Sequence, residues 1–150
     1  MLWLLVIDLG IVVGAGLFEH RIALAGWLPT GPDGARHWDA LRARRDDTGR
    51  RFWILFTTTG LTLLTLASLI LAWSAPAPGR WWWLAAAAAA LVDRAMTFGY
   101  FIPTMVRLLA SEDTPEAAAT AARWERVNVV RLAVAFVAWL LALRALTLLV

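Results

Sequence analysis

Four long apolar segments dominate this chain of 150 residues. They run from about residue 1 to 27, 52 to 73, 81 to 109 and 124 to 150. A helix of about twenty apolar residues crosses the hydrocarbon core of a bilayer and satisfies its own backbone hydrogen bonds there. The chain is 61% hydrophobic, whereas soluble domains are about 45–50% apolar. The sequence therefore predicts an all-α fold, in which residues 1–150 form one integral membrane domain: an antiparallel up-down bundle of four transmembrane helices.

The connections between these segments predict the orientation of the bundle. Arginine and lysine gather in cytoplasmic loops, and loop 28–51 contains six arginines whereas the turn 74–80 contains one. We therefore expect a multi-pass protein of the cell membrane, with loops 28–51 and 110–123 in the cytoplasm and both termini outside. Trp73 and the 81–83 cluster would then lie at the outer interface, and Trp27 and Trp53 at the inner one. The arginines of the two predicted cytoplasmic loops and their flanks are Arg36, Arg42, Arg44, Arg45, Arg50, Arg51, Arg107, Arg123 and Arg126.

The composition argues against several classes of protein. The chain has no cysteine, so it forms no disulfide, thiolate zinc site or iron–sulfur cluster. The two histidines, His20 and His37, do not follow the spacing of a haem site or of a carboxylate-bridged iron site. The formal net charge is +3, but no exposed basic domain is predicted to carry it. We therefore expect no metal, no cofactor and no nucleic-acid partner; the one metal alternative left open is a single mixed site of Glu19, His20 and Asp93.

Ionisable residues inside the predicted spans are the candidates for function. A charged side chain at the centre of a transmembrane helix costs about 2.5–3.5 kcal/mol on insertion scales, so such residues usually face the bundle interior and mark functional sites. Three are acidic and three are basic, and this equality predicts mutual neutralisation inside the bundle. They are Asp8, Glu19, Asp93, Arg94, Arg131 and Arg144.

Helical phase and depth place four polar residues in one layer. Measured from the cytoplasmic ends at about 1.5 Å per residue, Glu19, Tyr100, Asn128 and Arg131 lie about 6–14 Å deep. Trp124 shares a helix face with Asn128 and Arg131, because the spacings are four and three residues. The sequence therefore predicts a polar pocket that opens to the cytoplasm.

Further polar residues flank this layer. His20 follows Glu19, about 100° around the helix. Asp93 and Arg94 are expected to lie deeper, and Asp8 and Arg144 at a common level that is deeper still. We count His20, Asp93 and Arg94, with Asn128 and Trp124, as candidate substrate-binding residues. Structural roles remain open for all of them: a bundle-locking ion pair, an interior histidine, or an interhelical amide.

Two further patterns concern packing. Gly10 and Gly14 form a small-residue face on the first span, which permits close helix packing within the chain or a homodimer. Thr114 followed by Pro115 is typical of a helix N-terminus. That helix could continue directly into the fourth span.

Four motifs, one in each span, together resemble a known family. They are Gly16-Leu17-Phe18-Glu19, Arg51-Phe52-Trp53, Tyr100-Phe101-Ile102-Pro103-Thr104 and Trp124-x-x-x-Asn128-x-x-Arg131. This set resembles the anthrone-oxygenase-like family of small four-helix membrane proteins, most of which are domains of unknown function. The resemblance implies a polar cluster at the ends of the third and fourth helices. For some members it also implies oxidation of anthrones to anthraquinones by molecular oxygen without a cofactor.

That chemistry needs a base, a cation and an apolar cavity. Under the resemblance, Glu19 would act as the base, and Arg131 with Asn128 and Tyr100 would hold the phenolate oxygen of a small hydrophobic ligand.

Two other functions remain open at this point. Small multidrug exporters also have four helices and a functional glutamate in the first, so Glu19 could bind a proton and a cationic drug in turn. Against this, Arg94 and Arg131 would repel a cation in a small cavity. Alternatively, the charges only lock the bundle of a non-catalytic accessory protein, and the arginine-rich loop binds anionic membrane lipid.

Overall fold

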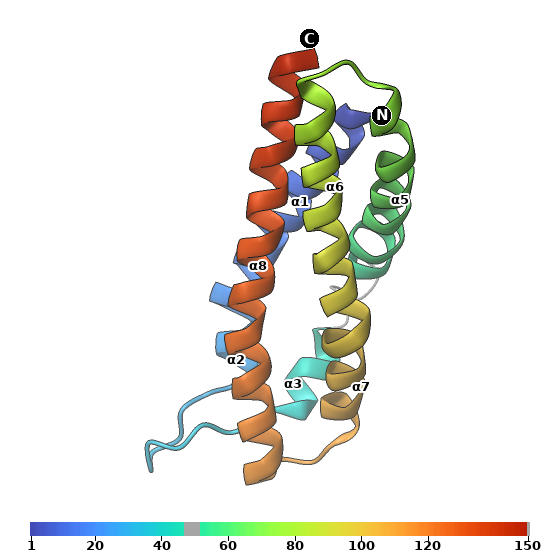
Figure 1. Cartoon of the computed structure of the whole chain (residues 1–150). Helices are drawn as coiled ribbons and strands as arrows, with labels where there is room; N and C mark the ends of the chain where they lie inside the picture. Colours follow the sequence, from blue (N-terminus) through green and yellow to red (C-terminus); the bar gives the residue numbers. More distant parts are fainter. Residues whose placement is uncertain (47–51, 150) are drawn as a thin grey trace.

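The computed structural model describes residues 1–46 and 52–149, which form helices and no β-strand. Four continuous helical spans run alternately up and down, and both chain termini lie at the same end of the bundle (Figure 1). Each span is long and apolar enough to cross a membrane, so the predicted all-α four-helix fold is confirmed. The spans are Leu2–Trp27, Trp53–Ser74, Gly79–Ala110 and Pro115–Leu149.

Three of the spans contain a π-helical segment in addition to α-helix. The first consists of α1 (Leu2–Phe18), the π-helix η1 (Glu19–Ala23) and α2 (Leu24–Trp27). The second consists of the π-helix η2 (Trp53–Gly60), α5 (Leu61–Leu71) and the 3₁₀ turn η3 (Ala72–Ser74). The third consists of α6 (Gly79–Met96), the π-helix η4 (Thr97–Phe101) and α7 (Ile102–Ala110). The fourth is the single helix α8 (Pro115–Leu149).

The fourth helix begins nine residues before the predicted span, at Pro115. The Thr114 hydroxyl accepts a hydrogen bond from the Ala117 backbone N–H at 3.1 Å. Pro115 occupies the first helical position, where the missing N–H costs nothing. The predicted N-cap of this helix is therefore confirmed, and it starts one uninterrupted helix of 35 residues.

Small residues let the helices approach closely in the bundle core. Alanines of α6 and α8, including Ala86, Ala90, Ala138 and Ala142, are fully buried in the core cluster. On α1, Gly10 faces the indole of Trp139 on α8, and a methyl group added there would lie 3.3 Å from its Nε1. The small-residue face is thus used for packing within the chain, at Gly10 at least.

A small structural unit closes the end of the bundle that lies opposite to the termini (Figure 1). This unit is called the cap below. It consists of residues 28–46, which contain α3 (Ala40–Arg45), together with the end of α7 and the start of α8. Trp38 is its buried centre and donates a hydrogen bond to the Leu108 carbonyl at 2.9 Å. The Arg44 guanidinium donates to the Leu109 carbonyl at 2.6 Å, which is a favourable position for a cation at a helix C-terminus.

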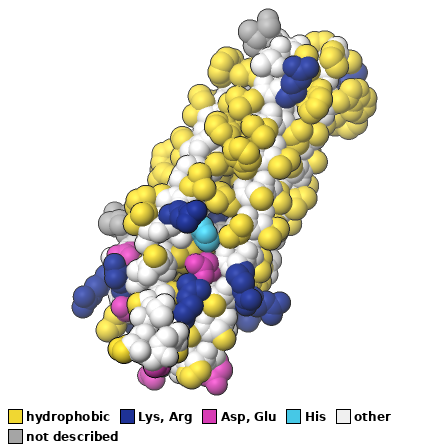
Figure 2. Space-filling model, turned by 90° about the vertical axis from the view of Figure 1, so that its left-hand side faces the viewer, with side chains coloured by type: hydrophobic (Ala, Val, Ile, Leu, Met, Phe, Trp, Pro, Cys, Tyr) yellow, Lys and Arg dark blue, Asp and Glu magenta, His cyan; other side chains and the backbone are white. Residues whose placement is uncertain are grey.

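Charged side chains gather around the cap, and hydrophobic side chains cover most of the remaining surface (Figure 2). The cap also includes the exposed arginines Arg36, Arg42, Arg44 and Arg45. Arg50 and Arg51 of the predicted cytoplasmic loop lie outside the described residues. The distribution of polar surface therefore agrees with a bundle that is embedded in lipid up to the cap.

Candidate functional site

Five of the six intramembrane ionisable residues form one row inside the bundle, called the charge cluster below. α1 provides Asp8, η1 provides Glu19, α6 provides Asp93 and Arg94, and α8 provides Arg131. All five side chains are buried. Asp8 and Glu19 are eleven residues apart on one continuous helical span, so the row extends about 16 Å along the bundle.

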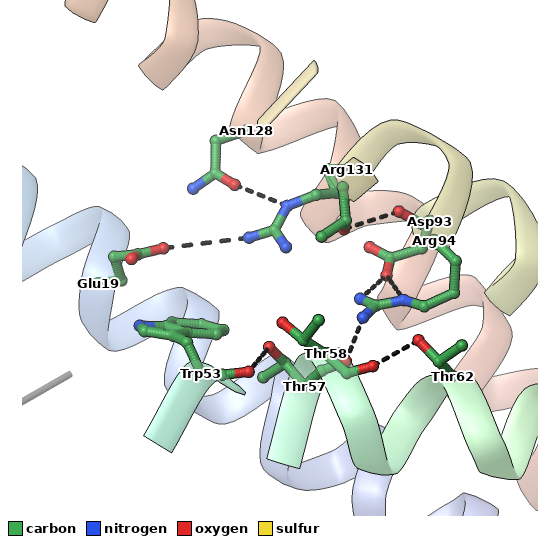
Figure 3. A network of polar contacts seen from close by, with 10 residues as sticks. Glu19, Trp53, Thr57, Thr58, Thr62, Asp93, Arg94, Asn128 and Arg131 are labelled. Carbon is green, nitrogen blue, oxygen red and sulfur yellow. Dashed lines mark hydrogen bonds and ion pairs between the residues drawn. The ribbon is translucent and has the colours of Figure 1, made fainter. Parts of the chain in front are cut away.

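Arg131 is the centre of the cap-side half of this row. Its Nη2 lies 4.0 Å from Oε2 of Glu19, and its Nε donates a hydrogen bond to Oδ1 of Asn128 at 2.9 Å. The guanidinium carbon also lies 4.8 Å from the ring centre of Phe101 and 5.9 Å from that of Trp53. Figure 3 shows Arg131 reaching toward Glu19 and Asn128. An amide and two aromatic rings thus hold the guanidinium close to the carboxylate.

Asp93 and Arg94 form a second pair beside Arg131. Their side chains are joined by hydrogen bonds, and Arg94 also donates to the backbone carbonyl of Thr57 in η2. Arg131 lies within electrostatic range of both residues. Asp8 is in turn under the electrostatic influence of Arg94. The two pairs and Asp8 therefore act on one another as a single cluster.

All three π-helical segments border the charge cluster. η1 begins with Glu19, η2 contains Trp53 and Thr57, and η4 ends with Phe101. π-Helical turns are rare and occur frequently at functional sites, because they redirect side chains that a regular α-helix would point elsewhere. Their coincidence at one level marks this part of the bundle as the candidate site.

Several buried polar atoms of the site have no hydrogen-bond partner among the described residues. They include Asp8 Oδ2, His20 Nδ1, Asp93 Oδ1 and Asn128 Nδ2. An unsatisfied buried polar atom costs about 1–3 kcal/mol. The Glu19–Arg131 separation of 4.0 Å is also too long for a direct hydrogen bond. The cluster therefore retains the capacity to hydrogen-bond a polar ligand.

The structure brings together most of the residues that the sequence suggested. Glu19, Asn128 and Arg131 meet in one layer. Trp124 is buried and donates from Nε1 to the Phe101 carbonyl at 3.3 Å, so it supports the ring that faces Arg131. His20 is partly buried beside Glu19.

Tyr100 lies at the edge of the site. Its ring packs edge-on against Phe101, with the ring centres 5.2 Å apart. Its hydroxyl makes no hydrogen bond to any residue in the described part of the chain. A role for Tyr100 in holding an oxyanion remains a prediction.

The expected balance of three acidic and three basic groups inside the bundle was wrong. Asp93 and Arg94 belong to the same cluster as Arg131, on which both act electrostatically. Arg144 lies outside the charge cluster: it is exposed, and its guanidinium lies 6.0 Å from the ring centre of Trp82. Asp8 instead lies beside Gly60, where an added methyl group would be 3.6 Å from Oδ1. The cluster therefore has three carboxyl groups but only two guanidinium groups.

Sequence reasoning missed three residues of the site. Trp53 was expected to mark the membrane interface, but it faces the guanidinium of Arg131. Thr57 provides a backbone carbonyl, and Phe101 provides a ring. Two of them, Trp53 and Phe101, belong to the motifs that suggested the family resemblance. Those motifs were the sequence signal that could have identified both residues as part of the site.

Two grooves lie near the bundle surface. One, of about 260 Å³, lies between α5 and the α6–η4 segment and is lined by apolar residues, by Thr65 and by Arg94. The other, of about 440 Å³, belongs to the cap and is lined by His37, Trp38, Asp113 and their neighbours. Only the first includes a residue of the charge cluster. Among the described residues, no group of three or more His, Cys, Asp or Glu side chains could hold a metal ion.

Comparison with known proteins gives one match. A family model named anthrone oxygenase matches residues 35–141. This range contains Trp53, Asp93, Arg94, Asn128 and Arg131, whereas Asp8 and Glu19 precede it. No curated protein and no solved structure matches the chain.

Proposed function

This chain belongs to the anthrone oxygenase family, and we propose that it oxidises a hydrophobic phenolic molecule of the anthrone type with molecular oxygen inside the membrane. The observation that carries this proposal is the Glu19–Arg131 pair. A buried carboxylate and a buried guanidinium face each other at 4.0 Å, with hydrogen-bonding capacity left over. A base and a cation are the two groups that this oxidation needs from a protein.

The reaction can be written with these residues alone. The Glu19 carboxylate removes a proton from the CH₂ group between the aromatic rings, and the electron pair spreads onto the ring oxygen. Arg131, oriented by Asn128, stabilises that oxyanion. The carbanion reduces O₂ and forms a C–O bond, and the resulting hydroperoxide loses water. In sum, R₂CH₂ and O₂ give R₂C=O and H₂O, so atoms and electrons balance.

The surroundings of Arg131 suit a flat aromatic ligand. The rings of Phe101 and Trp53 both approach the guanidinium, so a third ring system would meet aromatic neighbours. The groove beside Arg94, of about 260 Å³, is lined mainly by apolar residues and is slightly smaller than typical small-molecule sites, which measure about 300–1,000 Å³. A ligand dissolved in the bilayer could enter by this route.

Oxygen consumption by the purified protein tests the proposal. The wild-type protein in detergent is expected to consume O₂ with an anthrone and to produce the quinone absorbance. Glu19→Gln and Arg131→Leu are expected to abolish both signals. Arg144→Leu is the matched control, because it removes an arginine of the same helix outside the charge cluster. Unchanged turnover in either cluster variant, or no turnover in the wild type, would overturn the proposal.

The exporter alternative has less support from the cluster. A cationic drug that binds Glu19 would meet the Arg131 guanidinium 4.0 Å away, and the two positive charges would repel each other in a low-dielectric interior. An accessory role would leave the unsatisfied atoms of the cluster without a purpose. We therefore favour the enzyme.

A further inference from the structure

The charge cluster contains an odd number of ionisable groups. Asp8, Glu19 and Asp93 are acidic, whereas Arg94 and Arg131 are basic, so the fully ionised cluster has a net charge of −1. An uncompensated charge is costly in a buried, lipid-surrounded site, and such a site usually neutralises it by binding a proton. We propose that the cluster holds one exchangeable proton, and that Asp8 carries this proton while Glu19 and Asp93 remain ionised.

The ion pairs identify Asp8 as the carrier. Asp93 is hydrogen-bonded to Arg94, and Glu19 faces Arg131 at 4.0 Å. Asp8, in contrast, makes no ion pair within the described part of the chain, and its buried Oδ2 has no hydrogen-bond partner there. Each guanidinium is thus engaged by another carboxylate, and Asp8 is the acid in excess.

The neighbours of Asp8 agree with a neutral carboxyl group. The charged group that acts on it is Arg94 of α6, which is already bonded to Asp93 and to the Thr57 carbonyl. The neighbour of Asp8 in η2 is Gly60, which has no side-chain charge. On the side of α8, the α1 residue Gly10, two positions after Asp8, faces the uncharged indole of Trp139.

This inference goes beyond the proposed function, because the proton is bound in the resting protein without substrate. It also gives the proposed base its charge state. With the proton on Asp8, the remaining two carboxylates balance the two guanidinium groups. Glu19 is then an anion that can accept a proton from a ligand.

Infrared spectroscopy can detect and locate this proton. The purified protein near neutral pH, without substrate, is expected to show the carbonyl stretch of a protonated carboxyl group, and this band is expected to move in D₂O. Labelling all aspartates with ¹³C at the side-chain carboxyl should shift the band, whereas the same labelling of all glutamates should not. Asp8→Asn should remove the band. The matched control, Asp33→Asn, removes an exposed carboxylate of the cap and should leave the band unchanged.

Each alternative outcome would overturn the inference. Absence of the band in the wild type would mean that the cluster keeps its net charge. A shift on glutamate labelling would place the proton on Glu19, and persistence of the band in Asp8→Asn would place it on another aspartate. Because no substrate is present, these results are independent of the oxygen-consumption test of the proposed function.

Discussion

At the scale of single residues, Asn128 shows how one amide holds the buried guanidinium of Arg131 in place. It is almost completely buried, and its Oδ1 accepts from Nε of Arg131 at 2.9 Å. Asn128→Leu leaves that N–H without an acceptor, so we expect the free energy of unfolding to fall by about 1–3 kcal/mol and oxygen consumption to be lost. Thermal denaturation in detergent measures the first effect.

Thr147→Val is the control for this variant. Thr147 is exposed, and its hydroxyl donates a hydrogen bond only to the Arg144 carbonyl of its own helix, an interaction that contributes little to stability. We expect it to leave both stability and turnover unchanged. An Asn128→Leu protein as stable and active as this control would show that the amide does not position Arg131.

A second residue-scale prediction concerns pH and the cap. The Ala35 backbone N–H donates to Asp33 at 3.1 Å, and His37 lies 3.6 Å away. The hydrogen bond from Ala35, followed by His37, holds the pKa of Asp33 below its usual 3.8. Because the folded pKa is the lower one, the carboxylate stabilises the loop fully above the unfolded pKa. This stabilisation is lost as the pH falls through the folded pKa.

The chemical shift of the Ala35 amide reports this titration. We expect a midpoint below pH 3.8 in the wild type and no such transition in Asp33→Asn. A midpoint at or above 3.8 would mean that the hydrogen bond does not form in solution.

At the scale of elements, the sequence located part of the site for a clear physical reason. α1 is a regular helix up to Phe18, so a separation of eleven residues does place Asp8 and Glu19 on the buried side. Residue counting gives height along a helix, but it gives neither the angle around the bundle nor the reach of a side chain. It therefore did not show that Asp93 and Arg94 lie near enough to Arg131 to act on it electrostatically.

The π-helical segments explain why the second span was uninformative. The periodicity of an α-helix does not apply between Trp53 and Gly60, because the turns there are wider. This segment also has no ionisable residue that could signal an inward face. Trp53 therefore resembled an interface tryptophan in sequence, and only the structure shows its ring near Arg131.

The start of α8 yields the element-scale prediction. The Thr114 hydroxyl satisfies the Ala117 N–H, which is one of the free donors of the first turn. Thr114→Ala is expected to lower the free energy of unfolding by about 1 kcal/mol, whereas Thr114→Ser should keep most of it. Denaturation of the two variants in the same detergent measures the difference. Equal stability of the two would show that the hydroxyl does not cap the helix.

At the scale of the whole molecule, the lengths of the spans predict which end projects from the lipid. About twenty helical residues are enough to cross the hydrocarbon core. The third and fourth spans have 32 and 35 residues, and their excess length lies at the cap, where they pack with Trp38 and its neighbours. The cap has its own small core, and we expect it to lie outside the bilayer.

The arginines of the cap predict the side of the membrane on which it lies. Under the positive-inside rule we expect the cap in the cytoplasm, so Glu112 in the α7–α8 connection should face the cytoplasm and Ser74 should face outside. The chain has no cysteine, so single cysteines can be introduced at these two exposed positions and labelled with a membrane-impermeant maleimide. Ser74→Cys should react in intact cells, and Glu112→Cys only after permeabilisation, while the cysteine-free parent should not react at all. The reverse pattern would invert the orientation of the bundle, and Glu19 would then lie nearer the outer face of the membrane.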